Sequence, residues 1–259
     1  MTVRFLSAGD RALVVEFGDR VDPALSADVL RLDTSLRTSG LLGVVETVPT
    51  FRSLMVHYDP LTTTRANLEQ EITSLLDRRP DPRSAVTLWR VPVCYEGEFA
   101  PDLTEVGRLT GVTPREVVGL HSSVRYHVYM LGFLPGFPYL GDLPERLALP
   151  RRADPRVRVP AGSVSIATNL SAIYPYESPG GWHLIGATPI RLFDPERPRP
   201  ALLAPGPVRA TRTASATNSS VGPLRRISNA GIPRGLPTSA LASRRLTPSS
   251  APDTGTPIA

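Results

Sequence analysis

The fold is decided by the stretch YHVYMLGFLPGFPYLG, residues 126–141. Short apolar runs alternate here with glycine and proline, a pattern typical of brief β-strands joined by tight corners. The same texture continues to about Ala204, without a long run of apolar residues at helical spacing. Many short strands separated by Gly/Pro corners predict an all-β domain, either a barrel or a sandwich.

The segment just before this stretch supplies the start of the same domain. Residues 86–95 alternate apolar and polar side chains, which predicts a strand. Two short helices are predicted over residues 102–109 and 114–122, and Asp102 is expected to cap the first of them. We therefore predict that this β-rich domain spans residues 85–205.

Residues 1–80 have a different organisation, with both strand and helix signals. Two β-rich runs within residues 4–17 precede a helix from Pro23, whose apolar residues recur at helical spacing. A hairpin over residues 44–58 and a second helix from about Thr64 follow. The order ββαββα predicts a small α+β sandwich, with both helices on one face of an antiparallel sheet.

Segments of biased composition separate and follow these two domains. Pro-Asp-Pro at residues 80–82 breaks the chain and marks the predicted boundary. Residues 206–259 contain 15 Ser or Thr, seven Pro and no aromatic residue, so they offer too little apolar surface to offset the entropy of ordering. We predict that this segment is disordered. Pro207 cannot donate to a central ladder, so a strand there is expected to be missing or badly formed.

Charge and composition exclude several classes of function. All 29 basic residues are arginine, so the sequence has no lysine for a pyridoxal Schiff base, a lysine nucleophile or a G-x-x-x-x-G-K-[ST] phosphate loop. Residues 206–259 hold seven arginines and one acid, whereas residues 1–205 hold 22 arginines and 23 acids. The body of the protein is therefore nearly neutral, which argues against nucleic acid as a partner.

Cysteine usage and hydropathy indicate the compartment. Cys94 is the only cysteine, so a disulfide within the chain is impossible and a thiolate metal site is excluded. The apolar run at the N-terminus is too short for a signal peptide. No stretch approaches the roughly 18 apolar residues that span a bilayer. These observations predict a soluble cytoplasmic protein with no membrane partner.

Aromatic and glycine residues concentrate in one part of the β-rich domain. Residues 126–182 hold eight of the sixteen aromatic residues. Glycine beside proline and aromatic residues makes rigid loops, whose backbone amides and flat rings can line a pocket. The alternative is that the rings plug the ends of a barrel. The pocket residues predicted in this way are Phe133, Gly136, Phe137, Tyr139, Gly162, Ser163, Tyr174, Gly180, Gly181 and Trp182.

Arginine and histidine supply the candidate polar chemistry. Arg151 and Arg152, next to Pro150, could clamp a carboxylate or phosphate with a bidentate fork, and an ordinary surface pair is the competing interpretation. His121 is the candidate general acid or base, with a hydrogen-bonded structural histidine as the alternative. The sequence has no HExxH motif or close pairing of histidine with carboxylates, so we predict no metal site.

A chain of motifs in this region resembles a known bacterial family. The motifs are GFLPGFPYLG (132–141), PRR (150–152), VPAGSV (159–164) and YPYESPGGW (174–182). They are similar to those of the 5-oxoprolinase B subunits, a family also described as allophanate hydrolase subunit 1 or as KipI-type histidine-kinase inhibitors. The resemblance covers residues 1 to about 205. It implies an α+β N-terminal domain followed by a cyclophilin-like β-barrel.

The same resemblance implies an activity and partners. The enzyme of this family opens the 5-oxoproline lactam to glutamate with ATP, together with a C-type (KipA-like) and an A-type (LamB/YcsF-like) subunit. This chain has no motif for ATP, so the nucleotide chemistry is expected on the partner subunits and the isolated chain is expected to be inactive. The alternatives are inhibition of a sensor histidine kinase, and a role as an allophanate hydrolase or urea carboxylase-like subunit.

Each candidate residue has an expected role in such a reaction. One arginine of the pair 151–152 would hold the carboxylate of the small acid substrate, and the amides of residues 180–181 would stabilise an oxyanion. Tyr174 and Trp182 would form a wall of the pocket. His121 would act as the acid or base.

Overall fold

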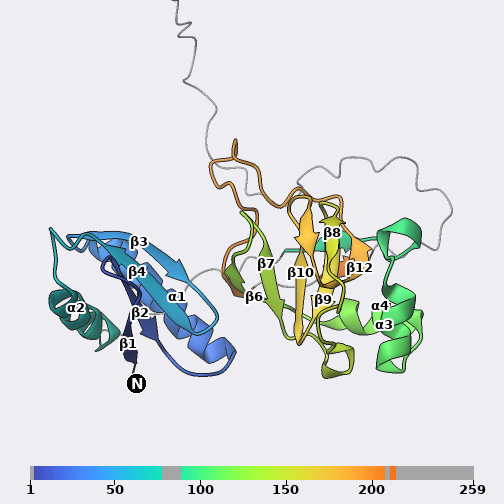
Figure 1. Ribbon diagram of the computed structural model, residues 1–259, viewed down its shortest axis with the longest axis horizontal. Coiled ribbons are helices and arrows are strands. Elements are labelled where there is room, and N and C mark those ends of the chain that lie inside the picture. Colours follow the sequence, from blue (N-terminus) through green and yellow to red (C-terminus); the bar gives the residue numbers. More distant parts are fainter. Residues whose placement is uncertain (1–2, 78–88, 208–210, 214–259) are drawn as a thin grey trace, which may run out of the picture. The chain divides into compact units, whose positions relative to one another are not determined.

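The computed structural model describes residues 3–77, 89–207 and 211–213 (Figure 1). Helices in these ranges are α1 (Pro23–Ser39), α2 (Arg65–Asp77), α3 (Leu103–Thr110) and α4 (Pro114–Ser123), with 3₁₀ turns η1 (Gly97–Phe99) and η2 (Glu145–Leu147). The strands are β1 (Arg4–Ser7), β2 (Ala12–Glu16), β3 (Val44–Pro49), β4 (Ser53–Tyr58), β5 (Val91–Val93), β6 (His127–Leu131), β7 (Pro138–Gly141), β8 (Arg156–Val159), β9 (Ser163–Ala167), β10 (Leu170–Ile173), β11 (Ser178–Gly180), β12 (His183–Ala187), β13 (Gly206–Pro207) and β14 (Thr211–Thr213). Within the described ranges, none of the helices has the length and apolar character needed to cross a membrane.

The first four strands form an antiparallel sheet in the order β1-β2-β4-β3. Every second residue of β4 is buried from Leu54 to Tyr58, as expected when one face of a sheet packs on a core. Helix α1 begins where the Asp22 side chain accepts a hydrogen bond from the amide of Ala24 at 2.8 Å. It ends at Gly40, whose φ of 61° disfavours any residue with a Cβ. The order of strands and helices is the one predicted.

Helices α1 and α2 share a hydrophobic core with this sheet. Each fully buried large apolar side chain of such a core stabilises the fold by about 1.5–3 kcal/mol. The buried residues are Leu13, Val15, Phe17, Val29, Leu32, Leu36, Leu54, Val56, Tyr58, Leu68 and Ile72. The domain boundary predicted at residues 80–82 lies outside the described residues and stays a prediction.

A larger, six-stranded sheet has the order β12-β9-β10-β7-β6-β13, and all its ladders are antiparallel. Bulges in the β6–β7 and β9–β12 ladders curl the sheet. The closed barrel expected from the sequence is nevertheless not found among the described residues, because β12 and β13 lie at opposite ends of the sheet. The edges explain this difference. β13 has two residues and ends in Pro207, and the backbone of Ala187 in β12 pairs with Cys94 rather than with another long strand.

Two short strands lie in the segment that the sequence predicts to be disordered. β13 pairs antiparallel with β6, and β14 pairs parallel with β5. The structure therefore differs from the prediction at residues 206–207 and 211–213. Pro207 is compatible with its strand because β13 lies at an edge of the sheet, where proline is tolerated. The remaining residues of the segment, 208–210 and 214–259, lie outside the described residues.

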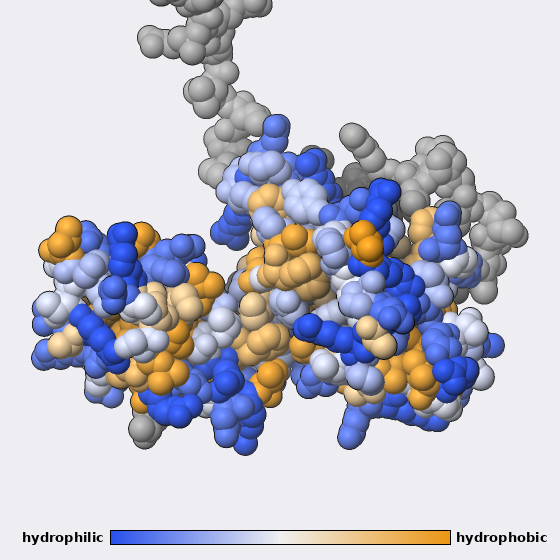
Figure 2. Space-filling model, viewed as in Figure 1, coloured by the Kyte–Doolittle hydropathy of each residue, from blue (hydrophilic) through white to orange (hydrophobic). Residues whose placement is uncertain are grey.

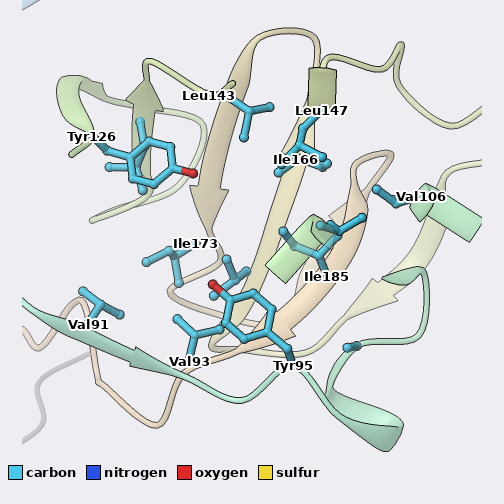
Figure 3. Close-up of a cluster of buried hydrophobic side chains, with 14 of the residues drawn as sticks. Val91, Val93, Tyr95, Val106, Tyr126, Leu143, Leu147, Ile166, Ile173 and Ile185 are labelled. Carbon is cyan, nitrogen blue, oxygen red and sulfur yellow. The ribbon is translucent and has the colours of Figure 1, made fainter. Parts of the chain in front are cut away.

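A second hydrophobic core joins the larger sheet to β5, α3 and α4. Figure 3 shows the side chains of Val93 and Tyr95 beside Ile173 in this cluster. Within the described residues, the strand predicted over residues 86–95 is limited to β5. The two predicted helices are present as α3 and α4, each within about one residue of its expected bounds.

Candidate functional site

The aromatic side chains predicted to line a pocket converge on Phe137. Its ring centroid lies 5.1 Å from those of Tyr139 and Tyr174, 5.4 Å from that of Phe133 and 6.3 Å from that of Trp182. The rings meet at interplanar angles of 60° to 89°, so their edges face neighbouring faces, which the aromatic quadrupole favours. The fold thus gathers five predicted residues into one cluster.

This aromatic cluster extends from the core to the surface. Phe137 and Tyr174 are almost fully buried, Trp182 is 7% exposed and Tyr139 is partly buried. Phe133 is 61% exposed. Figure 2 shows apolar surface over β7 and β10, bordered by polar residues. The outer rings of the cluster are therefore the ones that a ligand or another protein can touch.

The loop between β6 and β7 holds Phe133 in an unusual backbone conformation. Its φ is 69°, a left-handed value that is rare for a bulky residue and costs of order 1–3 kcal/mol. A hydrogen bond of 2.8 Å from the Leu134 amide to the Gly132 carbonyl closes the turn around it. Gly136, with φ of 77°, is required because a Cβ there would lie 2.8 Å from the Cβ of Phe193. The loop is fixed around its exposed ring.

Gly162 and Ser163 lie behind Tyr174 and hold its backbone. The Gly162 amide donates to the Tyr174 carbonyl at 2.7 Å, and the Tyr174 amide donates to the Ser163 carbonyl at 2.9 Å. Gly162 has a φ of 84°, and a Cβ at this position would collide with the Thr188 carbonyl oxygen. These two predicted residues are buried, and the contacts described here give them a supporting role.

The neighbouring glycines 180 and 181 differ in what surrounds them. The Cα of Gly180 lies against the Tyr174 hydroxyl, so that a Cβ would collide with it. A Cβ at Gly181 would meet Pro155 at 3.6 Å, an ordinary contact. The Gly181 carbonyl accepts a hydrogen bond from the Arg152 amide at 2.8 Å. The oxyanion role predicted for these two glycines stays a prediction.

The structure separates the two neighbouring arginines that the sequence could not tell apart. Arg152 donates to the buried carboxylate of Asp102 at 3.1 Å. Arg151 is exposed and forms no ion pair within the described ranges. Its positive charge acts on the hydroxyls of Tyr139 and Tyr174, whose pKa values it lowers slightly against the larger effect of burial. Arg151 is therefore the arginine available to a ligand.

Burial keeps the phenols of the cluster protonated. It raises the pKa of Tyr174 to about 12, with a smaller raising effect from Tyr139. It also raises the pKa of Tyr139 above its ordinary value. At neutral pH both hydroxyls are therefore hydrogen-bond donors. Together with the Arg151 guanidinium they form a group of donors suited to an anion such as a carboxylate.

Asp102 is a site residue that sequence reasoning treated only as a helix cap. Its side chain makes no capping bond to α3. It accepts instead from both terminal nitrogens of Arg156 at 2.7 and 2.9 Å, from Arg152 at 3.1 Å, and from the Leu184 amide at 2.7 Å. An aspartate just before a helix is a common cap, so nothing in the local sequence indicated these partners.

His121 lies in α4 and is fully buried. Its Nδ1 is 2.7 Å from the Tyr95 hydroxyl and its Nε2 is 3.0 Å from the Ser171 hydroxyl. Since Ser171 donates to the Ser165 carbonyl at 3.0 Å, it accepts from Nε2–H, and Nδ1 accepts from Tyr95. Burial lowers the pKa of His121 to about 3. This geometry favours the structural alternative over the predicted acid–base role.

His183, which the sequence analysis did not select, lies closer to the arginine pair. It begins β12 and is 6% exposed. Its Nε2 is 3.0 Å from the carbonyl oxygen of Pro150, the residue before Arg151. Its Nδ1 is the single buried side-chain nitrogen or oxygen of the described residues that has no hydrogen-bond partner. In the same part of the chain, no group of three or more His, Cys, Asp or Glu is placed to hold a metal ion.

The comparison with curated proteins gives close relatives over most of the chain. It is 37% identical over 224 residues to the 5-oxoprolinase B subunit of Bacillus subtilis, covering 80% of this chain and 92% of that protein. It is 41% identical over 202 residues to the 5-oxoprolinase B subunit of Escherichia coli O157:H7, covering 76% of this chain and 90% of that protein.

Structural comparison and family comparison agree with these matches. The crystal structure of TTHA0988 is similar with a TM-score of 0.69 and 36% identity over 78% of this chain. This chain spans only 39% of the TTHA0988 chain. The family model of the carboxyltransferase domain, subdomain C and D, matches residues 3–203. The chain therefore belongs to the carboxyltransferase domain family, subdomain C and D, and within it to the family of the 5-oxoprolinase B subunits.

Proposed function

We propose that this chain is one subunit of an ATP-dependent 5-oxoprolinase complex, which hydrolyses 5-oxo-L-proline to L-glutamate. The observation that carries the proposal is the similarity to two 5-oxoprolinase B subunits over 92% and 90% of their lengths. The letter in that name implies further subunits. TTHA0988, whose chain extends well beyond the matched 39%, supports a role beside further protein domains.

The partners proposed are a C-type (KipA-like) subunit and an A-type (LamB/YcsF-like) subunit. Because the sequence contains no lysine, a phosphate loop of the lysine type cannot form in this chain. We therefore assign ATP to the partner subunits. A complex that consumes ATP acts where ATP is held, which makes the cytoplasm its expected compartment.

The part of the reaction assigned to this chain is recognition and orientation of the small acid. 5-Oxo-L-proline is a five-membered lactam with one carboxylate. The Arg151 guanidinium would pair with that carboxylate, and the protonated hydroxyls of Tyr139 and Tyr174 would donate to its oxygens. The aromatic rings around Phe137 would pack against the lactam ring.

Orientation matters because the lactam amide is planar and stable, so its carbonyl must be activated before water attacks it. The amides of residues 180–181 lie beside the Tyr174 hydroxyl and are the proposed donors to a developing oxyanion. His121 takes no part in this proposal, because both its nitrogens are hydrogen bonded within the core.

Reconstitution tests this function. The chain is purified alone and together with its C-type and A-type partners, and ATP-dependent formation of glutamate from 5-oxo-L-proline is measured. We expect activity only in the complex. Arg151→Met in the complex should raise KM by about tenfold or more, the usual effect of losing a charge-assisted hydrogen bond. Arg158→Met is the matched control, because Arg158 pairs with Glu177 at the surface. Activity of the complex on allophanate but not on 5-oxoproline would refute the assignment.

A further inference from the structure

The peptide groups on both sides of Arg151 are anchored by one short segment at the start of β12. On one side, the Pro150 carbonyl lies 3.0 Å from Nε2 of His183. On the other side, the Arg152 amide donates to the Gly181 carbonyl at 2.8 Å. Because a carbonyl only accepts, Nε2 of His183 must carry the proton of the first bond. These two bonds fix the backbone direction from which the Arg151 side chain projects.

Side-chain contacts add a second anchor next to Arg151. Arg152 is tied to Asp102, whose carboxylate also holds Arg156 and the Leu184 amide. The segment is therefore held by backbone and side chain at residue 152, but at residue 150 the described residues supply only the bond from His183. Loss of that bond would release one side of Arg151.

The state of the His183 ring supports a specific role for Nε2. The ring is 6% exposed, and its Nδ1 is buried without a partner. An unpaired buried polar atom costs about 1–3 kcal/mol, so an apolar side chain of similar size would pack at lower cost. A histidine here is explained by what its other nitrogen does, which is to donate to Pro150.

We propose that His183 is a positioning residue, which holds the Pro150 carbonyl through Nε2–H and so directs the Arg151 guanidinium toward the carboxylate of the substrate. This inference rests on the proposed function of Arg151. Its readout is carboxylate recognition rather than stability alone, since a side chain that merely fills the core would not affect the preference for a charged substrate.

Three substitutions separate the two nitrogens of the ring. His183→Gln places an amide nitrogen four bonds from Cα, as Nε2 is, and so preserves the donor to Pro150. His183→Asn places its amide at the position of Nδ1 and cannot reach Pro150. His183→Phe keeps the ring volume without a donor. Thermal melting of each variant shows whether it is folded before its kinetics are compared.

The assay uses the reconstituted complex with 5-oxo-L-proline and with 5-oxo-L-prolinamide, which lacks the negative charge. We expect His183→Phe and His183→Asn to raise KM for 5-oxoproline by about tenfold with little change in kcat, and to leave KM for the amide nearly unchanged. His183→Gln should restore most of the preference for the acid. In the double variant with Arg151→Met, His183→Phe should add no further loss, because both changes remove one interaction.

The possible outcomes distinguish this inference from the proposed function. If the wild-type complex does not hydrolyse 5-oxoproline, the proposed function fails. If the wild-type complex is active and Asn rather than Gln restores the preference, the important atom is Nδ1 and the positioning role is wrong. Equal loss with both substrates, full additivity with Arg151→Met, or wild-type kinetics in the folded Phe variant would each overturn it as well.

Discussion

Asp102 offers the sharpest test of how this site is held together. Its carboxylate is 4% exposed as a residue and accepts four hydrogen bonds, from Arg152, from two nitrogens of Arg156 and from the Leu184 amide. Asp102→Asn keeps the size of the side chain but removes the charge. The amide also turns one acceptor into a donor, which then faces groups that can only donate.

The expected loss follows from the burial of each partner. Removing one member of a buried ion pair costs about 3–5 kcal/mol, because the remaining charge is left uncompensated. The side chains of Arg152 and Arg156 are 28% and 26% exposed, so water can partly solvate them in the variant. We therefore expect the lower end of that range, about 3 kcal/mol. For a body of this size that corresponds to a decrease in Tm of about 6–12 °C.

Chemical denaturation and thermal melting of the full chain measure this loss. Glu177→Gln is the matched control, because Glu177 pairs in the same bidentate way with Arg158, which lies two residues from Arg156 on β8. That pair is exposed, with side-chain accessibilities of 76% and 51%, so we expect no resolvable shift. A Tm for Asp102→Asn within about 2 °C of wild type, or an equal loss in the control, would refute the reasoning.

Three further predictions concern neighbouring parts of the structure. Gly180→Ala should lower substrate affinity much more than Gly181→Ala, because only the first Cβ collides with the Tyr174 hydroxyl; KM values of the two variants in the complex compare them. The pKa of His121 is lowered to about 3 in the folded state, so the unfolded chain binds the extra proton between pH 6.5 and about 3. Its contribution to stability should therefore be complete above pH 6.5 and fall as the pH decreases through that window, by up to about 1.4 kcal/mol per pH unit; a folded His121→Leu variant that keeps the same acid dependence in denaturation experiments would contradict this. Thr113→Ala should destabilise α4 by about 1 kcal/mol, since the Thr113 hydroxyl caps the helix by accepting from the amide of Glu116, and a denaturation midpoint equal to wild type would refute it.

Local patterns were sufficient to predict much of the fold, because they are set by neighbours in sequence. The apolar spacing of α1 and the alternation of β4 each record one buried face, and both elements were found as expected. Closure of the barrel and the strands β13 and β14 depend on pairing between residues far apart in the chain. Residues 211–213 pair with residues 91–93, a contact that no local pattern encodes. Predictions from composition therefore failed at those strands.

The candidate site shows the same division between local and distant information. Glycine and aromatic residues marked the cluster around Phe137, because their chemistry is visible in the sequence itself. The partners of Asp102 lie 50 and 54 residues away, so its position before α3 suggested only a cap. The pair 151–152 could be divided into a structural and an available arginine only once Asp102 was seen to bind Arg152.

The histidines differ most between sequence and structure, because their roles depend on what each ring nitrogen meets. His121 has both nitrogens paired within the core, and burial lowers its pKa, so it specifies packing between α4 and the sheet. His183 has one nitrogen paired, and that partner is the peptide next to an exposed arginine. A sequence cannot rank two histidines by such contacts. The structure can, and it moves attention from the histidine chosen for its position near a glycine-rich block to the one that holds the segment of Arg151.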